Sequence, residues 1–326
     1  FSGIVTGIIG GVIVGFFSGS QLSVSGPAAG LIAIVLGGIN QLGSFEIFLC
    51  AIIISGALQF IVGMLKAGSI ANYFPTNVIE GMLTAIGITI ILTQIPHALG
   101  FDKNAEVDSA VSSSGGGNLF TTLIDAVQSP EPMAIVITII AIGILILWQK
   151  VPTLAKLQLL PGALVAVLSG IVINQILIAV DSPLTLSGNH LVNLPVASNF
   201  SEFFGQFARP DFSGFLNPQV WILGGTIMIV GSIETLLCLE ATDKLDPLKR
   251  HSSPNKELKA QGICNIVSGF VGGLPLTSVI VRSSANINSG GKTKLSTIVH
   301  GLLLLVCASL IPVFLNKIPL ATLAAI

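Results

Sequence analysis

The chain has 326 residues, of which 52% are hydrophobic and 9% are charged, and its mean hydropathy is +0.91. Soluble domains carry about 25% charged residues, so this composition excludes a soluble globular protein and indicates an all-α polytopic membrane protein. The formal net charge of -1 says little, because in a membrane protein the positions of the charges matter more than their sum. We expect a lipid bilayer as surroundings and no nucleic acid as a partner.

Apolar runs long enough to cross or half-cross a bilayer follow one another along the chain. They cover residues 1–17, 22–36, 45–65, 78–99, 133–148, 161–179, 219–240, 258–272, 276–288 and 295–315, and an eleventh begins near residue 318. The chain begins with Phe1 rather than Met and ends inside this last apolar segment. We therefore expect a piece of a longer protein, cut at both ends.

Basic residues are distributed unevenly between the two sides of these spans. If the spans alternate, ten Lys and Arg residues fall in the connections on one side and three on the other. The larger group is Lys66, Lys150, Lys156, Lys244, Lys249, Arg250, Lys256, Lys259, Lys292 and Lys294. The positive-inside rule predicts that this side is cytoplasmic.

Two charged residues remain inside predicted spans. Arg282 would cost roughly 2.5 to 3.5 kcal/mol at the centre of a spanning helix, so such a residue usually faces a partner or a watery cavity. Glu234, in the run 219–240, is expensive for the same reason unless it is paired, solvated or protonated. Since burial raises a carboxyl pKa and a nearby cation lowers it, Glu234 could load and release a proton. Alternatively, it only neutralises Arg282 or caps a helix end.

Gly and Pro interrupt the apolar pattern at two places, Ser25 to Pro27 and Gly272 to Pro275. Paired interruptions point to the central binding site of a transporter. Each puts a Pro-fixed segment before a helix start, where backbone N–H groups lack partners and the helix carries about half a positive charge. Two such half-helices meeting near the midplane would bind an anion; the alternative is an ordinary pair of kinks. The expected binding residues are Ser25, Pro27, Ala28, Ala29, Ser278, Val279, Ile280 and Arg282.

Other chemistry finds little support in the sequence. The four cysteines lie in apolar stretches without paired spacing, so they indicate neither disulfides nor zinc, and no cluster of metal ligands occurs. We expect no metal and no cofactor. An intramembrane enzyme would need a nucleophile beside a base, and Ser23, Ser25 and Ser278 have no predictable His or Lys neighbour. We therefore do not expect an enzyme.

Four motifs resemble the sulfate permease (SulP) family of anion transporters, in order and over essentially the whole chain. They are GSQLSVSGPAAG at residues 19–30, SIETLL at 232–237, NKELKAQGICNIVSGFVGGLP at 255–275, and Arg282 followed by SGGKT at 289–293. The resemblance implies a multi-pass protein of the bacterial inner membrane and a homodimer. It also implies a fold of two inverted seven-helix repeats, with the anion between two discontinuous half-helices.

On this resemblance the chain runs from the second helix to the start of the twelfth, without the STAS domain usual in the family. A core domain would comprise about 1–99 and 219–293, and a gate domain about 100–218 and 294–326. The family's acidic coupling position falls on Glu234 and its basic position on Arg282. Cys238 and Ile280 stand where a sodium-coupled member has hydroxyls, which favours protons over sodium. Gln21 replaces a frequent basic residue and leaves the anion open.

The sequence thus predicts secondary active transport of a small inorganic anion of the sulfate, bicarbonate or chloride class. Proton symport by an elevator-type motion of core against gate is the expected mechanism. An uncoupled exchanger or channel of the same fold remains an alternative, because gating rather than a motif separates the two. A nucleobase symporter is less favoured, because it would tend to place a carboxylate where this chain has Arg282.

Overall fold

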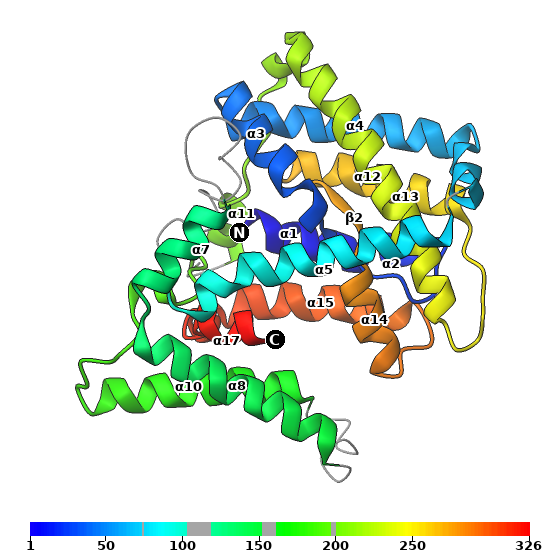
Figure 1. Cartoon of the computed structure of the whole chain (residues 1–326). Helices are drawn as coiled ribbons and strands as arrows, with labels where there is room; N and C mark the ends of the chain where they lie inside the picture. The colour runs from blue at the N-terminus through cyan, green and yellow to red at the C-terminus, as the bar shows by residue number, and fades with distance from the viewer. Residues whose placement is uncertain (74, 103–118, 152–160, 197–199) are drawn as a thin grey trace. The chain divides into compact units, whose positions relative to one another are not determined.

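The computed structural model describes residues 1–73, 75–102, 119–151, 161–196 and 200–326. Within these ranges the regular structure is almost entirely helical, as the composition predicts (Figure 1). The chain divides into two compact units: Phe1–Ile86 with Ala197–Leu310, and Gly87–Val196 with Ile311–Ile326. We call them unit 1 and unit 2.

Unit 1 contains the two interrupted segments and the helices around them. The N-terminal part of unit 1, Phe1–Ile86, contains α1 (Ser2–Ile9), a π-helical turn η1 (Gly10–Val14), α2 (Gly15–Phe17), β1 (Ser25–Pro27), η2 (Ala29–Leu31), α3 (Ile32–Leu42), α4 (Phe45–Met64), η3 (Ala67–Tyr73) and the first part of α5 (Thr76–Ala98). The second part of unit 1, Ala197–Leu310, contains α11 (Phe200–Gly205), η5 (Phe212–Leu216), α12 (Pro218–Leu245), α13 (Pro254–Phe270), β2 (Leu276–Ser278), α14 (Ile280–Asn288) and α15 (Leu295–Leu310).

Local sequence explains where the long helices of unit 1 begin. The hydroxyl of Ser44 accepts hydrogen bonds from the backbone N–H groups of Glu46 and Ile47, which caps α4. Asn217 caps α12 through the N–H of Gln219, and Pro218 occupies the first helical position, where its missing N–H is not needed. These caps fix both helix starts within a residue of the predicted ones.

Helix α4 packs against both α12 and α13 (Figure 1), and together with α3 and α12 it encloses an apolar core. Its fully buried members include Phe48, Ile52, Val220 and Ile227. At the α4–α13 contact two glycines face each other: a Cβ on Gly262 would lie 2.6 Å from the backbone N of Phe60, and one on Gly56 would lie 2.6 Å from the carbonyl O of Gly262. Such small residues let helix backbones approach closely in a membrane protein.

The two interrupted segments form a short antiparallel ladder. β1 pairs with β2, with Ser25 opposite Ser278, Gly26 opposite Thr277 and Pro27 opposite Leu276. Each strand leads within a few residues into a helix, β1 through η2 into α3 and β2 into α14 (Figure 1). Sequence analysis predicted the two interruptions and the helices after them, and the strand pairing is an addition from the structure.

Unit 2 has its own small core. Its elements, besides the rest of α5, are α7 (Leu119–Gln128), α8 (Pro132–Lys150), α10 (Gly162–Ala179), η4 (Gly188–His190), α16 (Pro312–Leu315) and α17 (Leu320–Ala325). Met133, Ile137, Leu186 and Ala321 are buried together in it. Asp102 accepts a hydrogen bond at each carboxylate oxygen, from Nδ1 of His97 and Nδ1 of His190, both at 2.6 Å.

Five helices of the described chain are long and apolar enough to span a bilayer: Phe45–Met64, Asn77–Ala98, Pro132–Lys150, Gly162–Ala179 and Pro218–Leu245. All five coincide with predicted runs, and the chain is an integral multi-pass membrane protein. One boundary differs: the run expected to end at 240 continues as helix to Leu245. The acidic and basic residues of that last turn and a half lower the hydropathy without breaking the helix.

Candidate functional site

The antiparallel pairing of β1 with β2, which we call the strand crossing, brings together the expected binding residues of the two interrupted segments. Ser25 and Ser278 lie opposite each other, and both are buried. The hydroxyls of Ser23 and Ser278 are 2.5 Å apart. The N–H of Val279 donates to the carbonyl of Val24 at 2.9 Å, which continues the ladder beyond the strands. Residues more than 250 positions apart in sequence thus form one buried element.

The half-helices begin directly beyond this crossing. Ala28 is buried and its carbonyl accepts from the N–H of Leu31 in the 3-10 turn that starts at Ala29. Helix α14 begins at Ile280, and its N-cap residue Val279 provides no side-chain hydrogen bond. Cys238 on α12 lies next to the Ile280 amide. The N-cap side chain thus leaves the first amides of α14 uncapped, and the Cys238 thiol is the side chain next to the first of them.

Arg282 lies across the first strand. A Cβ on Gly26 would be 2.5 Å from Nη1 of Arg282 and 3.1 Å from its Cζ, and one on Gly7 of α1 would be 3.8 Å from the same Nη1. Among the residues that the structure describes, no carboxylate forms an ion pair with this guanidinium. A cation in a membrane-spanning unit without a protein counter-ion is available to an anionic ligand.

Glu234 contacts the start of the other half-helix. A Cβ on Gly30 would lie 3.1 Å from each of its carboxylate oxygens, so the carboxylate lies directly against the Gly30 backbone. The Glu234 side chain is buried, and its Oε2 has no hydrogen-bond partner in the described part of the chain. Since α12 continues to Leu245, Glu234 lies about 16 Å from the end of the helix, farther from that end than the predicted boundary at 240 implied. Glu234 thus lies against Gly30, whereas Arg282 lies against Gly26.

Sequence reasoning did not single out a row of buried polar residues on α13. Glu257, Gln261, Asn265 and Ser268 recur every three or four positions, and each is at most 3% exposed. All four bond to the interrupted segments or to the turns beside them. Their helical spacing was a readable signal, because polar residues at i, i+4, i+8 and i+11 share one helix face.

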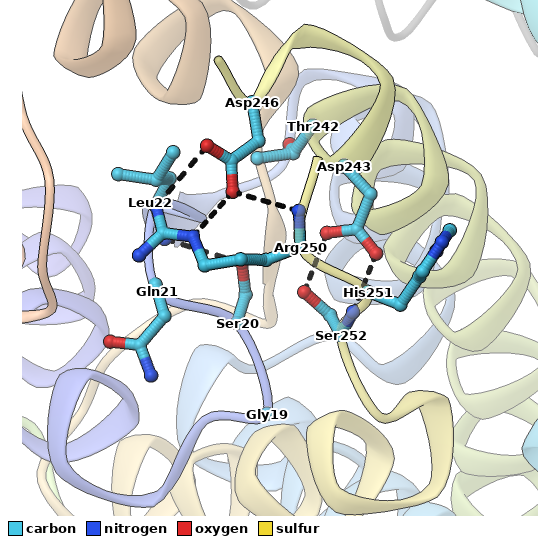
Figure 2. Close-up of a pocket in the computed structure, with 10 residues that line it drawn as sticks. All are labelled: Gly19, Ser20, Gln21, Leu22, Thr242, Asp243, Asp246, Arg250, His251 and Ser252. Carbon is cyan, nitrogen blue, oxygen red and sulfur yellow. Dashed lines mark hydrogen bonds and ion pairs between the residues drawn. The ribbon is translucent and has the colours of Figure 1, made fainter. Parts of the chain in front are cut away.

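A cavity of about 240 Å³ opens at the end of α12 that is predicted to be cytoplasmic. Figure 2 shows its lining, in which the chain from Gly19 to Leu22 faces Asp243, Asp246 and Arg250. Arg250 donates from Nε to Asp246 at 2.6 Å and from Nη1 to the Lys292 carbonyl at 2.8 Å. The hydrogen bond from the Arg250 side chain holds the pKa of Asp246 below its ordinary value. Because Arg250 is engaged in this way, its guanidinium is not free to bind an anion in this cavity.

Comparisons with known proteins agree with the sequence motifs. The model of the sulfate permease family matches residues 1–326. A putative sulfate transporter of Bacillus subtilis, YvdB, is 28% identical over 99% of this chain and 57% of its own length. The bicarbonate transporter BicA of Picosynechococcus is 28% identical over 100% of this chain and 56% of its length. The chain thus spans little more than half of these relatives.

Solved structures show the same fold. The transmembrane domain of the cyanobacterial bicarbonate transporter BicA superposes with a TM-score of 0.71 at 24% identity, over 99% of this chain and 78% of that one. SLC26A9 superposes with a TM-score of 0.69 at 15% identity, over 98% of this chain and 51% of that one. The expected helical membrane fold is confirmed by these two likenesses.

Proposed function

The chain belongs to the sulfate permease family, and from that premise we propose that it forms much of the membrane domain of a secondary transporter for a small inorganic anion. The relatives are named as transporters of sulfate or bicarbonate, and none of those names describes an enzyme. Sulfate, bicarbonate and chloride remain the candidate substrates. We further propose a homodimer in the bacterial inner membrane.

The observation that carries this proposal is the antiparallel crossing of β1 and β2 with Arg282 laid against Gly26. Two helix starts follow the crossing, each with backbone N–H groups and a partial positive charge. The guanidinium beside them adds a full positive charge that no described carboxylate neutralises. The proposed binding residues are those of the sequence prediction: Ser25, Pro27, Ala28, Ala29, Ser278, Val279, Ile280 and Arg282.

We propose that Glu234 couples anion movement to protons. It is buried at the start of the first half-helix, and one of its carboxylate oxygens lacks a described partner. A proton on that oxygen would remove the cost of burying a charge. Cys238 lies next to the Ile280 amide at the start of α14. The side chain of Cys238 is a thiol and that of Ile280 is an alkyl group. Neither is a hard oxygen ligand of the kind that sodium would need.

An elevator-type motion would require two bodies that move against each other. The proposed core (about 1–99 and 219–293) and gate (about 100–218 and 294–326) overlap largely with units 1 and 2. The structure groups α11, η5 and α15 with unit 1, whereas the sequence analysis assigned these segments to the gate. It also groups residues 87–98 of α5 with unit 2, whereas the sequence analysis assigned them to the core. Because compact units are defined by contacts and a transport core by motion, the assignment of these segments stays a prediction.

The proposal is tested on the full-length parent protein in proteoliposomes. Uptake of labelled sulfate, and separately of bicarbonate and chloride, is measured with and without an inward proton gradient. We expect uptake stimulated by the gradient in the wild type and loss of that stimulation in Glu234→Gln. Glu240→Gln is the matched control, because Glu240 lies on the same helix in a partly exposed ion pair with Lys244.

Two outcomes would contradict the proposal at different levels. Saturable anion uptake that ignores both the gradient and Glu234→Gln would favour the uncoupled exchanger or channel and leave Glu234 a structural role. Uptake of a labelled nucleobase in place of any anion would favour the nucleobase symporter.

A further inference from the structure

We propose that Asn265 and Gln261 of α13 are positioning residues for the anion site, because they hold β1 and β2 in the register that brings the two half-helix starts together. This inference rests on the proposed function and names residues outside the proposed binding set.

A two-stranded ladder of three residues per strand is marginal on its own. Within a membrane protein, backbone groups that the ladder leaves unpaired need partners from the protein itself. Leu276 of β2 lies opposite Pro27, which has no N–H to donate. Hydrogen-bonded and non-hydrogen-bonded pairs alternate along an antiparallel ladder. Because the Val279 N–H bonds to the Val24 carbonyl, Leu276 and Pro27 form a non-hydrogen-bonded pair, and the N–H and C=O of Leu276 point away from β1.

Asn265 supplies both of these partners. The N–H of Leu276 donates to Oδ1 of Asn265 at 2.8 Å, and Nδ2 of Asn265 donates to the carbonyl of Leu276 at 3.2 Å. A neighbouring strand would offer the same donor and acceptor pair. The side chain of Asn265 thus replaces a third strand at the edge of β2.

Gln261 holds the other strand from the same helix face, one turn earlier. Its Nε2 donates to Oγ of Ser25 at 2.6 Å and to Oε1 of Glu257 at 2.9 Å. Glu257 in turn accepts from the hydroxyl of Ser18 at 2.5 Å and the N–H of Gly19 at 3.0 Å. One face of α13 therefore fixes β1, β2 and the turn that leads into β1.

This arrangement has a consequence for affinity. Backbone amides bind an anion well only when both helix starts are already in place, since any ordering on binding costs free energy. Loss of a hydrogen bond that sets the crossing should therefore raise the KM for the anion. A residue needed only for folding would instead lower the amount of active protein and leave the KM unchanged.

The test compares Asn265→Ala, Gln261→Met and the control Gln59→Met in the full-length transporter. Gln59 on α4 accepts a hydrogen bond from the same Asn265 Nδ2 at 2.9 Å but is not bonded to either strand. Initial uptake rates against anion concentration give KM, and the maximal rate is divided by the amount of monodisperse protein. We expect Asn265→Ala to raise KM about tenfold and Gln261→Met about threefold, with wild-type KM in Gln59→Met.

Hydrogen exchange of peptides that cover residues 22–30 and 274–282 gives a second readout. We expect faster exchange of both in Asn265→Ala and wild-type exchange in Gln59→Met. Wild-type KM or wild-type exchange in Asn265→Ala would overturn the inference, as would an equal rise of KM in Gln59→Met. Absence of saturable anion uptake by the wild type would instead overturn the proposed function, and the inference would fall with it.

Discussion

At the scale of single residues, the two intramembrane charges each lie against a glycine. Arg282 packs on Gly26 and Glu234 on Gly30, at distances that leave no room for a methyl group without movement. Gly26 lies within β1, and Gly30 lies within the 3-10 turn η2 that leads into α3. The glycines therefore let one short segment approach both charges, while the charges themselves remain unpaired with each other.

Gly26→Ala tests whether the position of the Arg282 side chain matters for the anion. The new methyl carbon would lie 2.5 Å from Nη1 of Arg282 and must displace the guanidinium. We expect the KM for the anion to rise about tenfold, which corresponds to about 1.4 kcal/mol of binding free energy. Uptake kinetics in proteoliposomes measure this. Gly3→Ala, where a Cβ meets nothing within 4 Å, should retain the wild-type KM; a wild-type KM in Gly26→Ala would show that Arg282 adjusts without cost.

At the scale of elements, the close packing of α4 against α13 fixes the position of the helix that bonds to β1 and β2. α13 carries the polar residues that contact the strands, and it packs closely against α4 at Gly56 and Gly262. Any displacement of α13 would move Asn265 and Gln261 with it. The helix contact and the strand crossing are therefore mechanically linked in unit 1.

Gly262→Ala should loosen this contact. The added methyl would lie 2.6 Å from the backbone N of Phe60, an atom that moves only if the helices separate. Overpacking of this kind lowers the free energy of unfolding by about 1 to 3 kcal/mol. Thermal melting in detergent checks the change. Gly225→Ala on α12 meets nothing within 4 Å and should melt at or slightly above the wild-type temperature, so equal melting of both variants would contradict the expectation.

At the scale of the whole molecule, the uneven distribution of basic residues predicts the orientation in the membrane. Ser253 precedes α13 on the basic side, and Ser187 precedes η4 on the other; both are exposed and neither side chain caps its helix. The positive-inside rule places Ser253 in the cytoplasm and Ser187 outside.

This orientation can be tested by labelling cells that express the full-length protein with a membrane-impermeant maleimide. We expect Ser187→Cys to react in intact cells and Ser253→Cys to react only after permeabilisation. The wild type controls for the native thiols, of which Cys50, Cys238 and Cys264 are buried and Cys307 is partly exposed. The reverse pattern would show that the basic side faces outward.

The sequence alone determined the helical membrane class, the positions of the long spans, the two interruptions and the isolated charges Arg282 and Glu234. These follow from local quantities: hydropathy over about 20 residues, the conformational limits of Gly and Pro, and the cost of a buried charge. The family was recognisable for a similar reason, since short motifs remained in order along the chain.

Only the tertiary structure decided how these parts meet. The register of β1 against β2 depends on contacts across some 250 residues, and three-residue strands with Gly and Pro carry no periodic signal. Likewise, local sequence cannot tell that Glu234 contacts Gly30 and Arg282 contacts Gly26, or that Asn265 completes the edge of β2. Partners for buried polar groups are set by where the helices cross, and this is a property of the packed chain.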